Sequence, residues 1–588
     1  MHPTRLSYRQ NTPLPGRQFS PSTTQHSTPW PTLHRGPSFL SKRLQTVADR
    51  AVSSPVKKDV AQSPVKKDVA QRAFATDQTF VWEKNWYAVL PESMVDPEKP
   101  YGFTLLGKEL VLWRDAEQNW RVLDDKCSHR QARLSRGRLS KKDGNLMCGF
   151  HGWKFNGEGQ CTKIPQAPKD MERKFCSSRR SGVGSYPVQV KQGLIWVWGE
   201  SSPKAWVESS MNEIDTWDEV PDEYVWPFSE MPMGYHTMME MFFDLSHVPI
   251  LHEGTIPGAG ENSAVPMDMK VLKSGKDGFS LISTGYMKST AKCPTTIEFK
   301  APGTCSAVFR KPSGVKNLVR AYYTPTSPGK CRVIVGLKTV EPKKKHGKVG
   351  LIQQTHAEVK KIQKLDHALI PRYLLTDLLP KLVDRLVTSL RRFAVEVGLE
   401  FLPETWRIAL SHAMPRSTKL ENQDMHVLLG MDQVLNGIEK KWKRQYFSPL
   451  KADVGVMAFR NWLDRYSKGD VKWAPGAKAY DAKSFEDVFD RWNRHTKHCK
   501  HCRQTAKDLI GWATKLRRVA TVALIASGWL LLSSGTFKFR PCLGALVVAG
   551  LSMLTAGKID RILTSMKSSI PHDSLPGNVD LVYKESTG

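Results

Sequence analysis

The sequence predicts an α+β protein: an all-β N-terminal domain, an α+β domain after it, and a C-terminal transmembrane helical hairpin. Three observations support this fold class. β-Branched and aromatic runs broken by turn residues fill residues 80–200, and strand-like and helical stretches alternate in residues 201–510. Two nearly uncharged apolar runs then occupy residues 519–535 and 541–557. With 588 residues, the chain is long enough for two or more domains with cores of their own.

Short antiparallel strands are expected throughout the first domain. The segments that carry them are VWEKNWYAVL, YGFTLLGKELVLWRD, WRVLDDKCSH, YPVQV and GLIWVWGE, and the last of them closes the unit near residue 200. In the second domain, VIVGLKTV predicts a strand, whereas IQQTHAEVKKIQKL and KLVDRLVTSLRRFAVEV predict helices. The second domain therefore mixes the two element types.

Both apolar runs near the C-terminus are about 17 residues long, at the short end of what a bilayer-spanning helix needs. A buried helical hairpin is the alternative. Positive charges precede, connect and follow the two runs, which favours a hairpin with both flanks on one side of the membrane without deciding the side. We therefore expect a two-helix membrane anchor at 519–557 and a tail at 558–588.

Residues 1–72 have the composition of a transit peptide followed by a disordered repeat linker. The first 48 residues contain no Asp or Glu, six Lys or Arg, and many Ser, Thr and Pro, with no apolar stretch of the kind that directs secretion. The nonapeptide SPVKKDVAQ then occurs at 54–62 and again at 63–71. Its charged centre and lack of aromatic residues indicate a spacer.

The formal net charge of +30 favours an anionic membrane surface as a partner over nucleic acid. Residues 1–72 account for +9 of this charge, from twelve Lys or Arg against three Asp. The densest later run, EPKKKHGK at 341–348, has no interleaved aromatic residues and is expected to be a solvated loop. Ten cysteines scattered over a long chain also favour a reducing compartment over a secreted disulfide framework.

Residues 127–151 contain two matched ligand pairs, Cys-x-His in CSHR and Cys-x-x-His in CGFHGW. The four side chains are Cys127, His129, Cys148 and His151. A zinc site usually pairs Cys with Cys and His with His, whereas mixed pairs suit a Rieske-type 2Fe-2S cluster, in which two thiolates hold one iron and two imidazoles the other. The pattern therefore predicts one-electron chemistry, and zinc is the alternative.

A second metal site is predicted in MMEMFFDLSHVPILHEG. Asp244, His247 and His252 follow the spacing Asp-x-x-His-x4-His, and we expect the chain to break at Pro249 and so return the second imidazole toward the first. Two His and one carboxylate on one face of Fe(II) leave positions open for dioxygen and substrate. Asp244 need not be a ligand, because a carboxylate bonded to the outer nitrogen of a ligand His can link two metal centres.

The third iron ligand must come from another segment, and Asp424 in ENQDMHVLLGMDQVL is our choice. Helical apolar periodicity lets this carboxylate point inward. Asp432 is the second choice by the same argument, and a surface aspartate on a helix is the alternative interpretation of Asp424.

Cys499 and Cys502, in HTKHCKHC, suggest a thiol switch, because a Cys-x-x-Cys among Lys and His can hold a thiolate of low pKa. A metal site that includes His495 or His498 is the rival hypothesis. Unpaired structural thiols are the third possibility.

These residues resemble the Rieske non-haem iron oxygenases. HGWKFNGEGQCTKIPQAP, FFDLSHVPILHEG, HTKHCKHC and the apolar hairpin are similar to the chloroplast branch, which contains pheophorbide a oxygenase, a protochlorophyllide-oxidising relative and a translocon-associated Rieske protein. The resemblance covers about 80–557 and is nearest to the pheophorbide a oxygenase type. It implies a Rieske domain at 80–200 and a helix-grip-like catalytic domain with a mononuclear iron and the late Cys-x-x-Cys at 201–510.

The resemblance also implies a role for each motif residue. The cluster ligands would be Cys127, His129, Cys148 and His151, the iron ligands His247, His252 and Asp424, and the bridge between the centres Asp244. In this family the bridge spans a subunit contact in a homotrimer. Members commonly have Asn shortly before the bridging Asp and Pro inside the first Cys-x-His, where this chain has Met241 and Ser128.

The resemblance leads us to expect a chloroplast oxygenase anchored in the thylakoid or inner envelope membrane, with its catalytic part in the stroma. Reduced ferredoxin would supply electrons to the cluster, and dioxygen and a chlorophyll-derived tetrapyrrole would be the substrates, with opening of the pheophorbide a ring as the leading reaction. Hydroxylation or oxidation of protochlorophyllide, chlorophyllide or a phyllobilin is one alternative. A non-catalytic redox-sensing component of an envelope translocon is the other, and nucleic acid is not expected as a partner.

Overall fold

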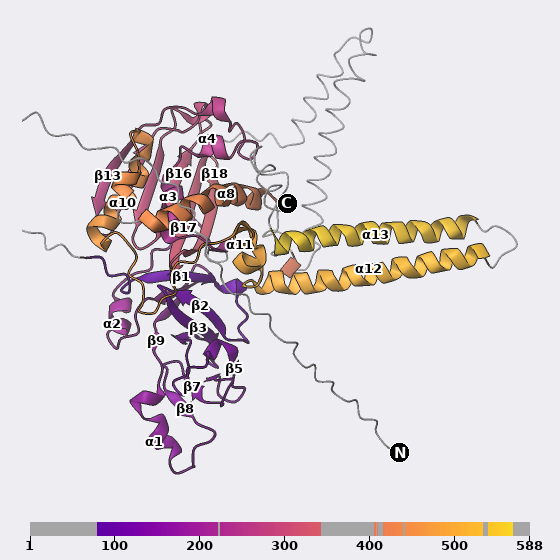
Figure 1. Cartoon of the computed structure of the whole chain (residues 1–588), viewed down its shortest axis with the longest axis horizontal. Coiled ribbons are helices and arrows are strands. Elements are labelled where there is room, and N and C mark those ends of the chain that lie inside the picture. Colours follow the sequence, from indigo (N-terminus) through magenta and orange to yellow (C-terminus); the bar gives the residue numbers. More distant parts are fainter. Residues whose placement is uncertain are drawn as a thin grey trace, which may run out of the picture. The chain divides into compact units, whose positions relative to one another are not determined.

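The computed structural model describes residues 79–221, 224–342, 405–406, 409, 415–438, 442–532 and 539–568, which all belong to one structural unit, Phe74–Gly588 (Figure 1). The predicted leader and spacer lie outside these residues. So do most of the tail, most of the basic run at 341–348, and the helices predicted from IQQTHAEVKKIQKL and KLVDRLVTSLRRFAVEV.

Three small antiparallel sheets form the first part of the described chain, as the β-branched and aromatic runs predict. Their strand orders are β1-β11-β10, β2-β3-β4-β9 and β5-β6-β7-β8. The strands are β1 Trp86–Pro91, β2 Tyr101–Leu105, β3 Lys108–Arg114, β4 Trp120–Asp124, β5 Arg138–Leu139, β6 Leu146–Met147, β7 Lys154–Phe155, β8 Cys161–Lys163, β9 Ser185–Tyr186, β10 Val188–Lys191 and β11 Leu194–Trp198. Two short helices, α1 Glu172–Cys176 and α2 Ala205–Ser210, accompany them.

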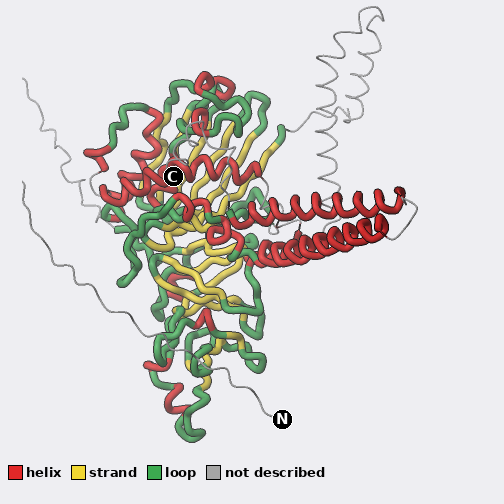
Figure 2. Tube along the Cα trace, turned by 45° about the vertical axis from the view of Figure 1, so that its right-hand side comes forward, coloured by secondary structure: helices red, strands yellow, loops and turns green. Residues whose placement is uncertain are grey.

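The second part is built on a seven-stranded antiparallel sheet, which Figure 2 shows as the group of long yellow strands. Its order is β12-β18-β17-β16-β15-β14-β13. The strands are β12 Phe228–Met231, β13 Met269–Gly275, β14 Gly278–Ser283, β15 Thr295–Lys300, β16 Thr304–Arg310, β17 Lys316–Ser327 and β18 Lys330–Val340. Burial alternates along β14 and β15, so one face of these strands contributes to the core.

Helices accompany this sheet, as expected for an α+β fold. They are α3 Tyr235–Phe243, α4 Val248–Leu251, α8 Pro415–Ile438, α9 Trp442–Gln445, α10 Val454–Ser467 and α11 Phe485–Phe489. Of these helices, α3 and α10 contact strands of the sheet. Phe243 of α3 and Phe459 of α10 meet with ring centroids 5.7 Å apart, and Phe459 lies 5.8 Å from Phe299 of β15. A Cβ on Gly455 would lie 2.6 Å from the carbonyl oxygen of Phe243, so glycine permits α10 to approach the end of α3 closely.

A short π-helix, Trp492–Thr496, precedes two long antiparallel helices, α12 Lys500–Leu532 and α13 Phe539–Lys567. The two long helices lie side by side in both views (Figures 1 and 2). Many large apolar side chains on them are exposed, among them Val522, Ile525, Trp529, Leu551 and Leu554.

Among the described residues, one segment, Pro541–Lys567 in α13, is long and apolar enough to cross a membrane. Residues 519–532 of the apolar run predicted at 519–535 form the second half of α12, whose first half carries charged residues. Two spanning helices were expected, and by length and composition one of them qualifies.

Candidate functional site

Two loops with the same backbone hydrogen bonds carry the four residues predicted to bind the cluster. The first loop, 127–132, follows β4. The N–H of Cys127 donates to the carbonyl oxygen of Ala132 at 2.8 Å, and the carbonyl of Cys127 accepts from the N–H of Gln131 at 2.9 Å. Both the N–H and the carbonyl group of Cys127 therefore hold this loop closed.

The second loop, 148–153, follows β6 and repeats this arrangement. The N–H of Cys148 donates to Trp153 at 2.8 Å, and its carbonyl accepts from Gly152 at 3.1 Å. Gly152 has φ +74°, and Gln131 at the equivalent position of the first loop has φ +60°. A positive φ is uncommon for a side chain such as that of Gln131, so the loop shape is maintained against local preference.

The thiols and the imidazoles of the two loops differ in exposure. Cys127 and Cys148 are each 2 % exposed, whereas His129 is exposed and His151 is half-buried. The two imidazole centroids lie 4.6 Å apart, and Trp153 stacks on His129 with centroids 4.7 Å apart. Two thiols thus lie on the inner side and two imidazoles on the outer side.

This arrangement fits a cluster better than zinc. In the described part of the chain, no three of these four residues have ligand atoms that all lie within 4.8 Å of one another. One zinc ion needs its ligands around a single point, whereas a Rieske cluster divides its four ligands between two irons.

The end of α3 and the short helix α4 position the residues predicted to surround the catalytic iron. Helix α3 ends at Phe243, and Asp244 is already extended, with φ −91° and ψ 101°. His247 and His252 cap the two ends of α4. The expected chain break at Pro249 is wrong, because Pro249 lies in the first turn of α4, where its missing N–H would have no helical partner.

Helix α8 brings Asp424 to these two histidines. Oδ1 of Asp424 lies 3.2 Å from Nε2 of His252 and 3.7 Å from Nε2 of His247. Ligand atoms of the three residues all lie within 4.8 Å of one another. Oδ1 of Asp424 is buried and has no hydrogen-bond partner among the described residues, which is costly unless a cation balances it. The donor set and this oxygen therefore fit a divalent iron.

Neighbouring side chains orient both imidazoles. Nδ1 of His252 lies 3.2 Å from Oε1 of Gln423, which can only accept, so Nδ1 carries the proton and Nε2 is left for a metal. Nδ1 of His247 lies 3.8 Å from Oδ2 of Asp244. Oδ1 of Asp244 accepts from the N–H and the hydroxyl of Ser246 at 2.8 and 2.6 Å, which fixes the carboxylate.

The electrostatics favour an ionised Asp244. Burial alone would raise the pKa of this carboxyl, but the nearby imidazole of His247 and the hydrogen bonds from Ser246 outweigh burial and lower the pKa. Burial would also lower the pKa of His247, and the carboxylates of Asp244 and Asp424 raise it instead. The carboxylates of Asp244 and Asp424 therefore place negative charge next to His247.

Asp432 lies outside this group. Its Oδ1 accepts from the N–H of Gly234 at 2.8 Å and from the hydroxyl of Thr237 at 2.6 Å. These bonds fix the start of α3. Hydrogen bonds therefore occupy the carboxylate of Asp432, whereas Oδ1 of Asp424 is buried without a hydrogen-bond partner among the described residues.

A buried ion pair that the sequence did not reveal supports the end of α3. Glu240 and Arg460 pair through Oε1 and Nε, and the hydroxyl of Tyr446 donates to Oε2 of Glu240 at 2.9 Å. The carbonyl of Glu240 accepts from the N–H of Asp244 at 3.0 Å. The pair thus fixes the backbone from which the predicted bridge projects. Gln423 was also missed, although its position next to Asp424 was a signal.

Cys499, Cys502 and His495 form a second compact group, and all three are buried. Nε2 of His495 lies 3.3 Å from Sγ of Cys502, and Nδ1 lies 2.8 Å from the carbonyl oxygen of Phe228. The hydrogen bond with Cys499 and burial raise the pKa of Cys502, so the expectation of a low-pKa thiolate is wrong for this thiol. His498 instead contacts the hydroxyl of Tyr101.

Comparison with known proteins adds to this geometry. Residues 85–187 match the family model described as Rieske [2Fe-2S] domain. Pheophorbide a oxygenase of Arabidopsis thaliana is 29 % identical over 425 residues, covering 67 % of this chain and 66 % of that protein. The protochlorophyllide-dependent translocon component 52 of the same plant is 27 % identical over 453 residues, covering 75 % and 76 %.

The chain contains a Rieske [2Fe-2S] domain and is similar over about two thirds or more of its length to chloroplast Rieske oxygenases.

A further chloroplast protein is similar to this chain to about the same degree. Flavonoid 8-hydroxylase 2 of Ocimum basilicum is 28 % identical over 438 residues, covering 71 % of this chain and 72 % of that protein. Among solved structures, dicamba monooxygenase with 3,6-dichlorosalicylic acid is 19 % identical with a TM-score of 0.35, covering 55 % of this chain and 92 % of that chain.

The protein is an oxidoreductase whose cofactors are a Rieske 2Fe-2S cluster and a mononuclear non-haem iron. The structure describes both residues that depart from the common family pattern, Ser128 and Met241. Ser128 donates from its hydroxyl to the carbonyl of Ser181 at 2.6 Å, and Met241 is half-buried against the core. The serine therefore gives the first loop a tether that a proline could not make.

Proposed function

We propose that the protein is a ferredoxin-dependent oxygenase that acts on a chlorophyll-derived tetrapyrrole, with oxygenolytic opening of pheophorbide a as the leading reaction. The observation that carries an oxygenase role is the buried Oδ1 of Asp424 beside Nε2 of His247 and His252. Pheophorbide a oxygenase among the relatives supports the substrate class. Hydroxylation or oxidation of another tetrapyrrole is the alternative within the enzyme class.

Each residue has a role in this proposal. The cluster is held by Cys127, His129, Cys148 and His151, and the catalytic iron by His247, His252 and Asp424. Bound iron would supply open coordination positions for dioxygen and substrate. Gln423 and Asp244 keep the two iron-binding imidazoles in the tautomer that offers Nε2.

Asp244 would be the bridge by which electrons from the cluster reach the iron. Its side chain is 37 % exposed, and its Oδ2 lies 3.8 Å from Nδ1 of His247. His129 is exposed as well. A carboxylate that touches one iron-binding imidazole and remains open to solvent can meet an exposed imidazole of a second subunit. This exposure supports the proposal of a homotrimer with transfer between chains.

We also propose that α12 and α13 anchor the protein in a chloroplast membrane, thylakoid or inner envelope, with the catalytic part in the stroma. The exposed apolar side chains of the two helices support this arrangement, because so much unpartnered apolar surface is unusual on a soluble protein. The domain boundaries proposed above, 80–200 and 201–510, and the leader 1–72 belong to the same proposal.

For Cys499 and Cys502 we propose a redox role through a disulfide between them. Binding of a metal ion together with His495 is the alternative, supported by the buried group that the three side chains form. Zinc analysis separates the two, because a structural metal is present before any oxidation.

Oxygen consumption tests the function. The full chain with both iron centres, reduced ferredoxin and dioxygen is given pheophorbide a, protochlorophyllide, chlorophyllide or a phyllobilin, with a flavonoid as a further arm because of the basil relative. Substrate-dependent oxygen uptake with pheophorbide a and a ring-opened product would support the leading reaction. Uptake with none of them, together with an unchanged phenotype for His247→Ala, would favour the non-catalytic translocon component.

A further inference from the structure

Two cysteines outside both metal sites lie in contact. Sγ of Cys161, at the start of β8, lies 3.2 Å from Sγ of Cys176, at the end of α1. A disulfide bond measures about 2.0 Å, so these are two thiols that need a small approach to become bonded. Cys161 is 7 % exposed, whereas Cys176 is half-buried, so the two differ in access to solvent.

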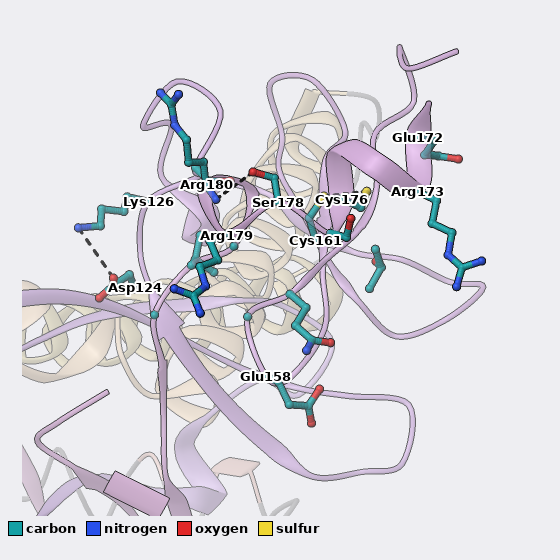
Figure 3. Close-up of a pocket in the computed structure, with 18 of the residues that line it drawn as sticks. Asp124, Lys126, Glu158, Cys161, Glu172, Arg173, Cys176, Ser178, Arg179 and Arg180 are labelled. Atoms are coloured by element: carbon teal, nitrogen blue, oxygen red, sulfur yellow. Dashed lines mark hydrogen bonds and ion pairs between the residues drawn. The ribbon is translucent and has the colours of Figure 1, made fainter. Parts of the chain in front are cut away.

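A cavity of about 1210 Å³ gives access to this pair (Figure 3). Both cysteines line it and lie next to each other in Figure 3. Its basic lining residues are Lys126, Lys169, Arg173, Arg179 and Arg180. Each of its three carboxylates has a basic partner within 4 Å, in the pairs Asp124–Lys126, Glu158–Arg121 and Glu172–Lys163.

Three arginines that line the cavity carry a positive charge that no acidic residue of the described chain neutralises. Arg173, Arg179 and Arg180 form no ion pair with a residue that the structure describes. Because its carboxylates are neutralised and these three guanidinium groups are not, the cavity favours an anionic ligand.

A chain of two hydrogen bonds joins the thiol pair to the cluster loop. The hydroxyl of Ser181 is shared between the carbonyl oxygens of Cys176 at 2.8 Å and Ser178 at 2.6 Å. The hydroxyl of Ser128 donates to the carbonyl of Ser181 at 2.6 Å. Ser128 lies between Cys127 and His129 in the first ligand pair. Hydrogen bonding and packing around a Rieske cluster influence its reduction potential.

We propose that Cys161 and Cys176 form a disulfide by exchange with a small anionic disulfide that enters the arginine-lined cavity, and that this bond shifts the reduction potential of the neighbouring cluster. The inference needs the cluster and does not depend on which substrate is oxidised.

The exchange balances as two displacements. The thiolate of the more exposed Cys176 attacks one sulfur of the incoming disulfide, whose S–S bond breaks and releases one thiol with the proton that Cys176 lost. The thiolate of Cys161 then attacks the Cys176 sulfur, and the second thiol leaves with the proton of Cys161. The protein dithiol loses two electrons and the incoming disulfide gains them. Burial, together with the hydrogen bond with Cys176, raises the pKa of Cys161 to about 12, and the mixed disulfide removes that hydrogen bond.

Glutathione disulfide is the probe for bond formation. Purified full-length protein with its cluster is incubated with it, alkylated and digested, and the peptides are identified by mass spectrometry. We expect a Cys161–Cys176 crosslink in the wild type, none in Cys176→Ser, and an unchanged crosslink in Cys293→Ser, which alters another half-buried cysteine. Both thiols remaining alkylatable, or a glutathione adduct on Cys176 without a crosslink, would overturn the proposal.

A redox titration followed by visible absorption tests the coupling. The cluster potential should shift between the dithiol and the disulfide forms of the wild type, and the shift should be at least halved in Ser128→Ala. Cys176→Ser should keep one potential with and without glutathione disulfide. Equal potentials for both wild-type forms would overturn the coupling, and the cluster absorbance per chain verifies that each variant is folded.

Discussion

Oε1 of Gln423 lies 3.2 Å from Nδ1 of His252, in a site where His252 is 2 % exposed. The amide oxygen fixes the tautomer of the imidazole and thereby aims Nε2 at the carboxylate of Asp424, 3.2 Å away. In the proposed iron site, two consecutive residues of α8 thus have different roles: Gln423 orients the imidazole of a proposed ligand, and Asp424 is itself a proposed ligand.

Gln423→Leu should therefore weaken iron binding without removing it. Loss of a partner that orients a ligand His typically costs about 10–100-fold in metal affinity. Competition with a chelator, read by iron content, measures the effect. Gln433→Leu makes the same change on the exposed part of α8 and should bind iron as the wild type does. Equal iron retention in both variants would contradict the assigned role.

Arg460→Met should destabilise the protein strongly. It leaves the carboxylate of Glu240 buried without its cation, and breaking a buried pair in this way costs about 3–5 kcal/mol. Lys443→Met removes a more exposed partner of Asp464 and should cost about 0–1 kcal/mol. Denaturant unfolding compares the two, and similar free energies of unfolding would show that the buried pair adds nothing to α3.

Native alkylation should distinguish the cysteines by their burial. Cys502 is 2 % exposed and its pKa is raised, first by the hydrogen bond with Cys499 and then by burial, whereas Cys176 lines a cavity. Since thiolates react and thiols do not, we expect iodoacetamide to label Cys176 at least about tenfold faster. Time-resolved mass spectrometry gives both rates. Faster labelling of Cys502 would mean that its surroundings open readily.

Leu551→Lys should weaken attachment to membranes. The side chain is 60 % exposed on α13, and a lysine near the middle of a spanning helix costs about 2.5–3.5 kcal/mol. Flotation with liposomes of chloroplast lipid composition measures binding. Met211→Lys, at a site 77 % exposed beside α2, is the control and should float like the wild type. Equal flotation of both variants would count against α13 as the anchor.

Sequence patterns were sufficient for features determined by nearby residues. The segment WRVLDDKCSH contains strand β4, VIVGLKTV lies within strand β18, and helical periodicity placed Asp424 on the inner side of α8. The cluster residues were recognisable because each pair lies within four positions. The preference for Asp424 over Asp432 matches the geometry, since only the former meets His247 and His252.

Long-range pairs were not predictable in this way. Glu240 and Arg460 are 220 positions apart, and their meeting depends on how α3 packs against α10. The contact between Cys161 and Cys176 was not predictable either, because a spacing of 15 residues does not reveal that β8 and α1 meet. The break assigned to Pro249 failed because proline is equally suited to the first turn of a helix.

Iron content per chain shows whether the protein holds both iron centres. A Rieske cluster and a mononuclear site together require about three irons per chain, of which the cluster accounts for two. Mass spectrometry of purified protein should find this number in the wild type and in Asp432→Asn, and about two in Asp424→Ala, with cluster absorbance unchanged in all three. Two irons in the wild type, or undiminished iron in Asp424→Ala, would contradict the account.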